Sequence, residues 1–390
     1  MIMNKLLFIL GIVLISTQSI EARHITGGEI TYTCNGLSQD GTTANITFDL
    51  LIFREFSNPE GADFDDDLEL GLYKRENSNW VYVEKSQPLE TVSISRLPQD
   101  FECYRFDIAA DAGLYSANFN IPNDGNDYMV AYQRCCFFDN VNNLHNQGSK
   151  LFGFAPSVLI SSLAISSCND SPTFNDLPVT NFCMRKETSL DFSIIDSESD
   201  SVVFNIVKVQ GAGGSNGNQS AGCDFVKPEP SECGPERFYD ISYVTSFGDI
   251  SPLTTNSFVE LDGDGILKFD PDVPGQLAIR VMISEYRNGV LLTEMSRIAT
   301  YLSTMTTSTE EDFVQNIFIY PNPNSGTVNI TNELTSNIRA IQIFSADGRL
   351  LKSFNKESKV LNISNLDNGL YIAWIQKQDR KWITKKLIKH

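Results

Sequence analysis

The residues best suited to chemistry are three short acidic clusters, and the chemistry that they suggest is calcium binding. Ca²⁺ takes roughly six to eight oxygen ligands, and alternate acidic residues in a loop can converge on one ion. The clusters comprise residues 63–67, then Asp196, Glu198 and Asp200, then Asp262 and Asp264. None has the spacing of an EF-hand loop, and acidic turns that are merely solvated are the more common case. We expect no cofactor other than Ca²⁺, held by the second cluster together with the third.

Eight cysteines form a second group, and all of them precede the last third of the chain. An even number in an exported protein indicates disulfides, because the periplasm and the exterior are oxidising. A zinc site is the alternative, but no Cys-x-x-Cys pair exists and the chain has only three histidines. We predict a local Cys223–Cys233 bond, with Cys34 and Cys103 paired to Cys135 and Cys136, and with Cys168 and Cys183 left to clip a second domain.

The adjacent Cys135 and Cys136 are the most unusual local feature of this group. Neighbours in a strand point to opposite faces, so each of the two can reach a different partner. A vicinal disulfide between them is the alternative.

Hydrolytic signatures are missing from the sequence. It contains no Gly-x-Ser-x-Gly elbow and no His-Glu-x-x-His motif, and His145 lies in a polar Asn/Gln stretch. Paired carboxylates for glycoside hydrolysis stay an open alternative, because their approach is spatial rather than sequential. We therefore predict no catalytic residues and no enzyme activity.

The elements that position these residues begin after a signal peptide. Lys5 precedes an apolar run from Leu6 to Ile15, and small residues follow up to Ala22. That order indicates an export signal over residues 1–22, and the run is too short to span a bilayer. No later stretch is apolar enough for a transmembrane helix, so the mature protein is not expected to cross a membrane.

Turn residues and alternating apolar runs predict an all-β chain of tandem antiparallel β-sandwiches. Apolar runs recur every eight to fifteen residues without helical periodicity, separated by clusters of Asn, Gly and Pro. We expect one sandwich at 23–165, a second at 166–303 and a polar linker at 304–315. Below, the two sandwiches together are called the body.

The body also carries a resemblance. The blocks HITGGEITYTCNG from His24, YMVAYQRCCFFDNVNNL from Tyr128 and ISEYRNGVLLTEMSRIATYL from Ile283 resemble an uncharacterised exported module of gliding Gram-negative bacteria. The match covers roughly residues 24–303. It implies Ig-like or cadherin-like sandwiches and supplies no catalytic residues.

Residues 316–390, called the tail below, consist of short alternating runs divided by turn signals. Asp347-Gly348 and Asn368-Gly369 favour two-residue hairpin turns, whereas Pro321 and Pro323 predict a rigid lead-in rather than a central strand. We expect a small separate β-sandwich with its own core. Its expected core positions include Phe344, Ile363, Ile372 and Trp374.

The tail resembles the C-terminal sorting domains of the type IX secretion system. The resemblance rests on Tyr320, Pro321, Asn322, Pro323 and Gly326, on Asp347 and Gly348, on Gly369 and Tyr371, and on the basic end with Lys385 and Lys386. It implies export through the Sec route and the periplasm to the outer surface. It also implies the secretion machinery and a surface sortase as partners.

Charge separates the tail from the rest of the chain. The tail holds 11 Lys/Arg and 5 Asp/Glu, so residues 1–315 carry a net charge of −25 within a total of −19. An acidic body repels nucleic acid, which is therefore not an expected partner. We expect a secreted or cell-surface, non-catalytic protein with a role in adhesion or surface structure. A secreted hydrolase or carbohydrate-binding protein with the same sorting tail is the alternative.

Overall fold

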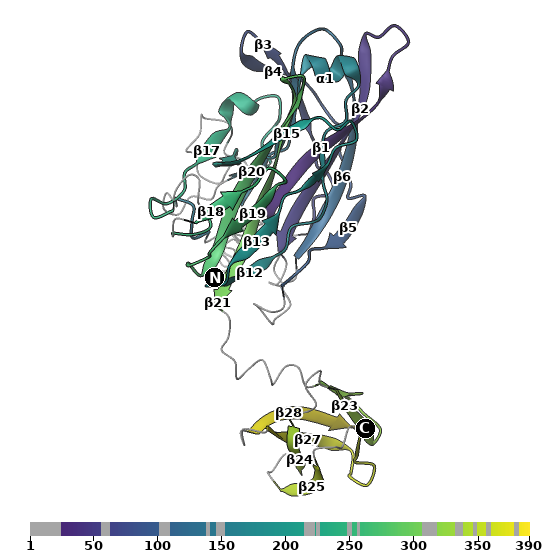
Figure 1. Cartoon of the computed structure of the whole chain (residues 1–390). Helices are drawn as coiled ribbons and strands as arrows, with labels where there is room; N and C mark the ends of the chain where they lie inside the picture. The colour runs from purple at the N-terminus through teal and green to yellow at the C-terminus, as the bar shows by residue number, and fades with distance from the viewer. Residues whose placement is uncertain are drawn as a thin grey trace, which may run out of the picture. The chain divides into compact units, whose positions relative to one another are not determined.

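The computed structural model describes residues 25–55, 63–100, 110–137, 141–145, 153–213, 223, 227–247, 252–255, 258–305, 318–331, 338–345, 349–355, 360–377 and 382–390. The chain forms two compact units, Met1–Thr306 and Thr307–His390 (Figure 1). Both are built from β-strands, which confirms the all-β prediction. Signal residues 1–22 lie outside the described part, as does the linker from 306 onward.

The first unit is built almost entirely from β-strands, with the short helices α1 and η1 between them. Its strands before residue 161 are β1 (Ile25–Leu37), β2 (Thr43–Glu55), β3 (Gly71–Glu76), β4 (Asn79–Lys85), β5 (Ser93–Arg96), β6 (Ala110–Pro122), β7 (Tyr128–Ala131), β8 (Arg134–Cys135), β9 (Gly153–Phe154) and β10 (Ser157–Ile160). The later elements are α1 (Ser162–Ser167), β11 (Thr173–Phe174), β12 (Asn181–Met184), β13 (Thr188–Asp191), β14 (Ile194–Ile195), β15 (Ser201–Val207), β16 (Val209–Gly211), η1 (Pro235–Arg237), β17 (Tyr239–Ile241), β18 (Val259–Leu261), β19 (Ile266–Phe269), β20 (Gly275–Arg287) and β21 (Val290–Met305).

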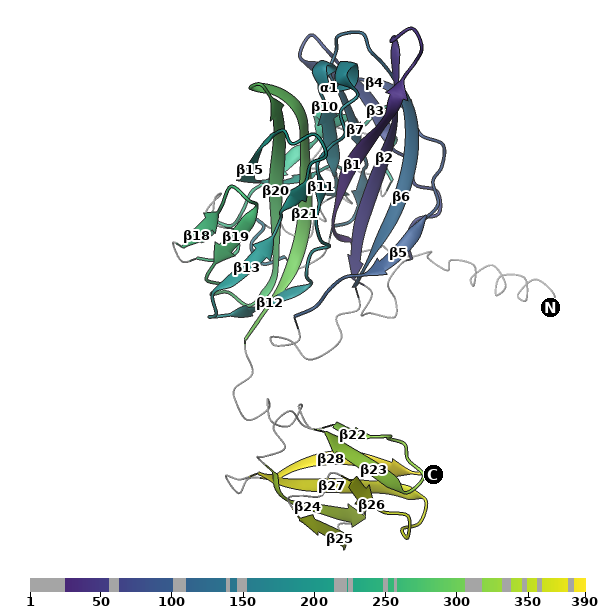
Figure 2. The same cartoon turned by 45° about the vertical axis from the view of Figure 1, so that its right-hand side comes forward.

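One large sheet joins most of this unit. Its strand order is β4-β3-β7-β10-β21-β1-β2-β6-β5, and β20 pairs with β21 along nearly its whole length. Every described pairing of named strands in this sheet is antiparallel except β12 with β21. Strand β21 therefore lies between β10 and β1 and also pairs with β20, which in turn pairs with β15 (Figure 2).

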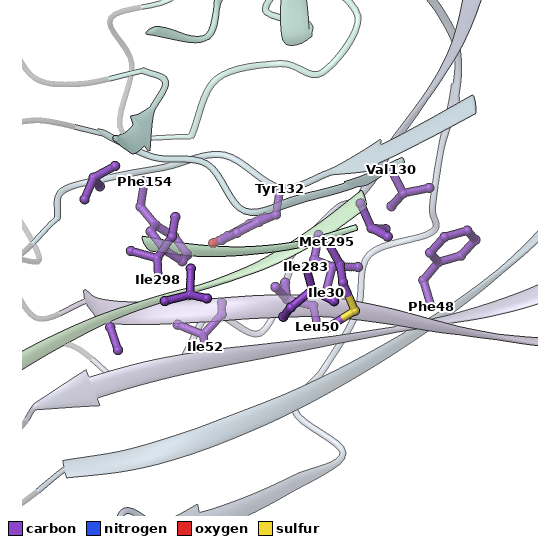
Figure 3. Close-up of a cluster of buried hydrophobic side chains, with 14 of the residues drawn as sticks. Ile30, Phe48, Leu50, Ile52, Val130, Tyr132, Phe154, Ile283, Met295 and Ile298 are labelled. Atoms are coloured by element: carbon purple, nitrogen blue, oxygen red, sulfur yellow. The ribbon is translucent and has the colours of Figure 1, made fainter. Parts of the chain in front are cut away.

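The expected division of the body into 23–165 and 166–303 is wrong at the level of the sheet. Strands β1 and β10 come from the first expected domain, yet both form hydrogen-bonded pairs with β21 from the second. Figure 3 shows Ile30 and Leu50 in the same buried cluster as Ile283 and Met295. Strand β21 also runs two residues into the expected linker. The body is one unit because its last strand returns to the middle of its first sheet.

Gly27 explains how β1 can lie so close to β21. A Cβ added at this residue would sit 2.0 Å from the carbonyl oxygen of Ile298, far inside van der Waals contact. The Gly27-Gly28 pair is therefore a point of close backbone approach rather than only the start of a strand.

A buried ion pair also links β1 to β21. Glu29 and Arg297 are 3% and 1% exposed. Arg297 donates to both carboxylate oxygens of Glu29 through Nε and Nη2, the latter at 3.0 Å, and its Cζ lies 3.8 Å from the ring centroid of Phe174. Since both charges are buried and paired, removal of either partner would leave an uncompensated charge in the core.

The tail forms two small sheets around a separate core. Strands β22 (Phe318–Tyr320), β23 (Thr327–Thr331) and β26 (Val360–Asn362) make the first, and β25 (Leu350–Asn355), β24 (Ile338–Ser345), β27 (Gly369–Lys377) and β28 (Trp382–Lys389) make the second. The core comprises Val328, Ile330, Ile341, Ile343, Leu361, Ile363, Tyr371, Ala373, Ile375 and Leu387.

The core predicted for the tail is only partly correct. Ile363 is fully buried, as expected, but Trp374 is 38% exposed, and Phe344 and Ile372 are half-buried. Side chains alternate between the faces of a strand, so Ile343, Ala373 and Ile375 fill the core while their neighbours face outward. On that outer face the rings of Phe344 and Trp374 pack against each other, with centroids 5.0 Å apart.

Candidate functional site

Asp196 and Asp200 meet at one place in the body, but their partner is Glu285 rather than the third acidic cluster. One carboxylate oxygen from each of the three residues lies within 4.8 Å of the others. Asp196 and Asp200 lie in the turn between β14 and β15, and Glu285 lies on β20, the strand that pairs with β15. Glu285 stands ninety residues downstream in a mainly apolar strand, so no local spacing signals its role.

Glu285 is the buried member of this group. It is fully inaccessible to solvent, and the side-chain nitrogen of Asn169 donates to both of its carboxylate oxygens at 3.1 Å. Burial raises the pKa of Glu285 to about 7, and the nearby Asp196 and Asp200 charges add to the rise. The cluster therefore contains a carboxyl that changes charge near neutral pH.

Arg287 supplies positive charge to the same cluster. Its guanidinium donates from Nε and Nη2 to the two carboxylate oxygens of Asp200, the first at 2.9 Å, and from Nη2 to Oδ1 of Asn169 at 2.7 Å. This bidentate pair already neutralises one of the three carboxylates. A bound cation would thus have to rely mainly on Asp196 and Glu285, because both oxygens of Asp200 already accept from Arg287.

Asp262 and Asp264, the other expected calcium ligands, are not part of this cluster. Asp262 accepts hydrogen bonds from the backbone N–H groups of Asp264 and Ile266, at 3.0 and 2.8 Å, and so closes the turn between β18 and β19. Glu198 is also outside the three-residue group and accepts from the Asp170 N–H at 3.2 Å. Asp262 therefore stabilises a turn, and Glu198 contacts the backbone of the segment before β11.

The cysteines form disulfides, but the only predicted pairing that is correct is Cys223–Cys233. Cys34 is bonded to Cys168, which ties β1 to the end of α1, and Cys223 is bonded to Cys233 as expected. Cys183 also takes part in a disulfide. Cys103 lies outside the described residues.

Cys135 and Cys136 are bonded to each other, and both are buried. The expectation of two separate partners assumed a regular strand through both residues. Strand β8 instead ends at Cys135, so the alternation rule does not apply to the pair.

In the tail, the Tyr-Pro-Asn-Pro-Asn-Ser-Gly motif is joined to the last strand by two asparagines. The side-chain nitrogen of Asn322 donates to the Lys386 carbonyl, and its oxygen accepts from the Ile388 N–H, both at 2.8 Å. Asn324 is 1% exposed, and both its backbone N–H and its side-chain nitrogen donate to the Ile388 carbonyl. The motif therefore holds the C-terminal strand in place, and Asn324 contributes to this although it is not among the residues singled out from the sequence.

Other motif residues shape the tail rather than forming a pocket. Pro321 and Pro323 lie between β22 and β23 and outside both strands, which agrees with the predicted lead-in. Gly326 has φ +122°, and a Cβ there would lie 2.7 Å from the Cα of Ser364, so only glycine fits. Tyr371 donates its hydroxyl to the Asp367 carbonyl at 2.5 Å.

The predicted hairpin at Asn368-Gly369 is wrong, because Gly369 is the first residue of β27 and the preceding strand belongs to the other sheet. That turn signal marks a crossing between sheets instead. Lys385 is half-buried and Lys386 is exposed, on β28. Asp347 and Gly348 lie outside the described residues.

Comparison with known families identifies this part of the chain. Residues 318–390 match the model of the secretion system C-terminal sorting domain. The tail is a type IX sorting domain. This confirms the resemblance within two residues of the expected boundary, and it assigns the protein to the cell surface or the extracellular space.

Comparisons for the body are far weaker. A search of curated proteins found no match. A solved structure of the Bacteroides ovatus mixed-linkage glucan utilization locus SGBP-B, in complex with a mixed-linkage heptasaccharide, is similar at 13% identity and a TM-score of 0.16. The similarity covers 57% of this chain and 48% of that one, so this chain spans about half of the length of that protein. Among the described residues, no helix is long and apolar enough to cross a membrane.

Proposed function

We propose that this protein is a non-catalytic component of the outer cell surface, or of the material released from it, with a role in adhesion or surface assembly. The observation that carries the proposal is the sorting domain joined to a disulfide-linked β body. The tail delivers the chain, and the body is the part that remains to act outside the cell. Type IX secretion components and a surface sortase are the partners during export.

The construction of the body supports a binding role. Disulfides suit the oxidising exterior, and the Glu29–Arg297 pair together with the Cys34–Cys168 bond fixes β1 against distant segments. A scaffold of this kind presents loops and strand edges in fixed positions, which suits recognition of a surface ligand. The high acidic charge of residues 1–315 keeps such a protein soluble and directs it away from nucleic acid.

The test is a comparison of adhesion between the producing strain, a deletion strain and a strain complemented with the full chain. We expect loss of adhesion or of surface-layer integrity on deletion and recovery on complementation. Purified mature protein should leave a panel of polysaccharides unhydrolysed. Unchanged adhesion combined with turnover of one polysaccharide would replace this proposal with the secreted hydrolase.

Carbohydrate binding is the second candidate function, and one observation favours it. The body contains a cavity of about 230 Å³ lined mainly by hydrogen-bonding side chains.

Calcium binding is a further proposal, with a revised ligand set. Asp196, Asp200 and Glu285 are the carboxylates that could share one ion. Carboxylate oxygens are the ligands that Ca²⁺ prefers, and protonation of Glu285 would weaken the site below neutral pH. The ion would act here as a structural tie between β20 and the turn before β15.

A further inference from the structure

The cavity lies where the first acidic cluster, residues 63–67, meets a proline-rich segment from far along the chain. Residues 65–69, which precede β3, form one wall, and residues 227–230 form the opposite wall. Residues 131–133, which end and follow β7, also line it. The remaining lining residues are Lys85 and Pro88.

Segment 227–230 is held in place by contacts that do not depend on a ligand. Tyr73 donates its hydroxyl to the Pro230 carbonyl at 2.9 Å, and the Cys223–Cys233 disulfide joins the two ends of the stretch. Gly71 leaves the room that Pro230 occupies, since a Cβ there would lie 2.8 Å from the Pro230 Cβ. The wall is therefore preformed, as small-molecule sites usually are.

Two lysines bridge the cavity between its walls. Lys85 lies 2.8 Å from a Glu69 oxygen and 3.3 Å from a Glu229 oxygen. Lys227 pairs with Asp67 and lies 3.4 Å from Asp65, whose carboxylate is also bonded by Arg134 at 2.7 Å. Each carboxylate has about four acceptor positions and each ammonium three donors, so these pairs keep unused hydrogen-bonding capacity.

Gln133 and Tyr132 form the floor between the two walls. The residue is 6% exposed, its side-chain nitrogen donates to the Cys233 carbonyl, and its Oε1 is buried without a hydrogen-bond partner. Because that oxygen is shielded from solvent, Gln133 forms part of the cavity floor and is not one of the groups offered to a ligand. Tyr132 also lines the cavity and donates its hydroxyl to Asp65 at 3.2 Å.

The charge balance excludes most ionic ligands. Four carboxylates and two ammonium groups line the cavity, so an anion meets excess negative charge. A cation would compete for these carboxylates with Lys85 and Lys227, which already pair with them. A neutral ligand rich in hydroxyl groups meets neither cost, because each hydroxyl can donate to a carboxylate and accept from an ammonium at once.

We propose that this cavity binds a single ring of a neutral saccharide, with Asp67 and Glu229 as hydrogen-bond acceptors and Lys85 and Lys227 as donors. The volume is below the range of roughly 300–1,000 Å³ that is typical of larger ligands, which suits one ring rather than an extended chain. The inference rests on the proposed binding function and gives it a ligand class and a site.

The experiment is saturation-transfer NMR on the full mature chain with probes that share one ring and differ in charge. The probes are methyl β-glucoside, methyl β-galactoside and methyl α-mannoside, with glucosamine as the cation and glucuronate as the anion. We expect at least one neutral glycoside to bind, and both charged rings to bind more weakly. A stronger signal from either charged ring, or no signal from any neutral glycoside, would overturn the assignment.

A double variant, Asp67→Asn with Glu229→Gln, locates the binding. Loss of charged acceptors should weaken binding about tenfold, while the melting curve stays unchanged because both side chains are mostly exposed. Glu76→Gln, on β3 and outside the cavity lining, is the matched control and should bind like the natural protein.

The two proposals fail in different ways. If the protein supports adhesion and the double variant binds glycosides as well as the natural protein does, the cavity assignment is wrong and the surface function stands. If deletion of the protein leaves adhesion unchanged, the surface function is wrong even when a glycoside binds in the cavity.

Discussion

The body is acidic, stabilised by disulfides and closed by a strand that returns from its far end, whereas the tail is basic, contains no cysteine and has a small apolar core of its own. In the body, contacts between residues more than a hundred positions apart decide the architecture, as in the pairs Cys34–Cys168 and Glu29–Arg297. Among the described residues of the tail, the side-chain hydrogen bond with the largest sequence separation joins Asn322 to Ile388. One chain therefore combines two modes of stabilisation. The body is cross-linked by disulfides, whereas the sorting domain is stabilised by its apolar core and by side-chain hydrogen bonds.

The largest effect on stability, confined to the body, should come from breaking the buried Glu29–Arg297 ion pair. Glu29→Ala leaves the Arg297 guanidinium unpaired in the core, so the free energy of unfolding of the body should fall by about 3–5 kcal/mol. Chemical denaturation should show this loss in the body transition and none in the tail transition. Glu76→Ala, which removes an exposed partner of Lys74, is the control and should change stability by less than about 0.5 kcal/mol. A loss below about 1 kcal/mol for Glu29→Ala would show that the pair is not a main support of the body.

Removal of the Cys34–Cys168 bond should have the next largest effect. The double variant Cys34→Ala with Cys168→Ala should lose about 2–4 kcal/mol, since the bond closes a long loop in the unfolded chain. The Cys223→Ala, Cys233→Ala pair is the matched comparison and should lose less, because its sequence separation is 10 rather than 134. Non-reducing peptide mapping that linked Cys34 to Cys135 or Cys136 would contradict the connectivity.

Calcium should stabilise the body and leave the tail unchanged, because the group of Asp196, Asp200 and Glu285 lies in the body. Binding to the folded state adds about 2.7 kcal/mol at a hundredfold excess over Kd, so the body should melt at a higher temperature in millimolar Ca²⁺ than in EDTA. Asp196→Asn should remove the difference, and Asp262→Asn should not. Identical melting in Ca²⁺ and EDTA would eliminate the site.

The smallest effect should be a pH dependence from Glu285, measured in EDTA. Its pKa is raised to about 7 in the folded protein, so the folded state holds a proton that the unfolded state releases near its ordinary value of 4.5. The stabilisation that the protonated Glu285 contributes is fully present below pH 4.5, and it is lost as the pH rises through about 7. The loss should be on the order of 1–2 kcal/mol, because Asp196 and Asp200, whose charges add to the shift, are only half-buried and solvent screens them. Glu285→Gln should flatten the profile between pH 5 and 8, and a profile unchanged by the variant would assign the dependence to another group.

The sequence was sufficient where local chemistry decides the structure. Pro321 and Pro323 follow a strand because proline cannot extend the ladder, and Gly326 occupies a position that no side chain fits. The tail was identified from such residues, and the family match agrees with it. The local Cys223–Cys233 bond was predicted for the same reason.

The sequence was insufficient where distant strands meet. Nothing near Val290 indicates that β21 will pair with both β1 and β10, so the body was divided into two domains that share one sheet. Glu285 joins Asp196 only through the pairing of β15 with β20, and the six-residue helix α1 is too short to show a helical period. Pairings of this kind are set by packing over the whole sheet and leave no local signal.

The central claim is that the tail is a sorting domain that folds independently of the body and directs the export of the body to the cell surface. The direct measurement is protease shaving of intact cells that have this secretion system and produce either the full chain or residues 1–315. We predict that the full chain is degraded by added protease. The truncated chain should be protected until the outer membrane is permeabilised, and it should keep the same disulfides and the same body melting transition. Equal degradation of the two forms on intact cells would contradict the account.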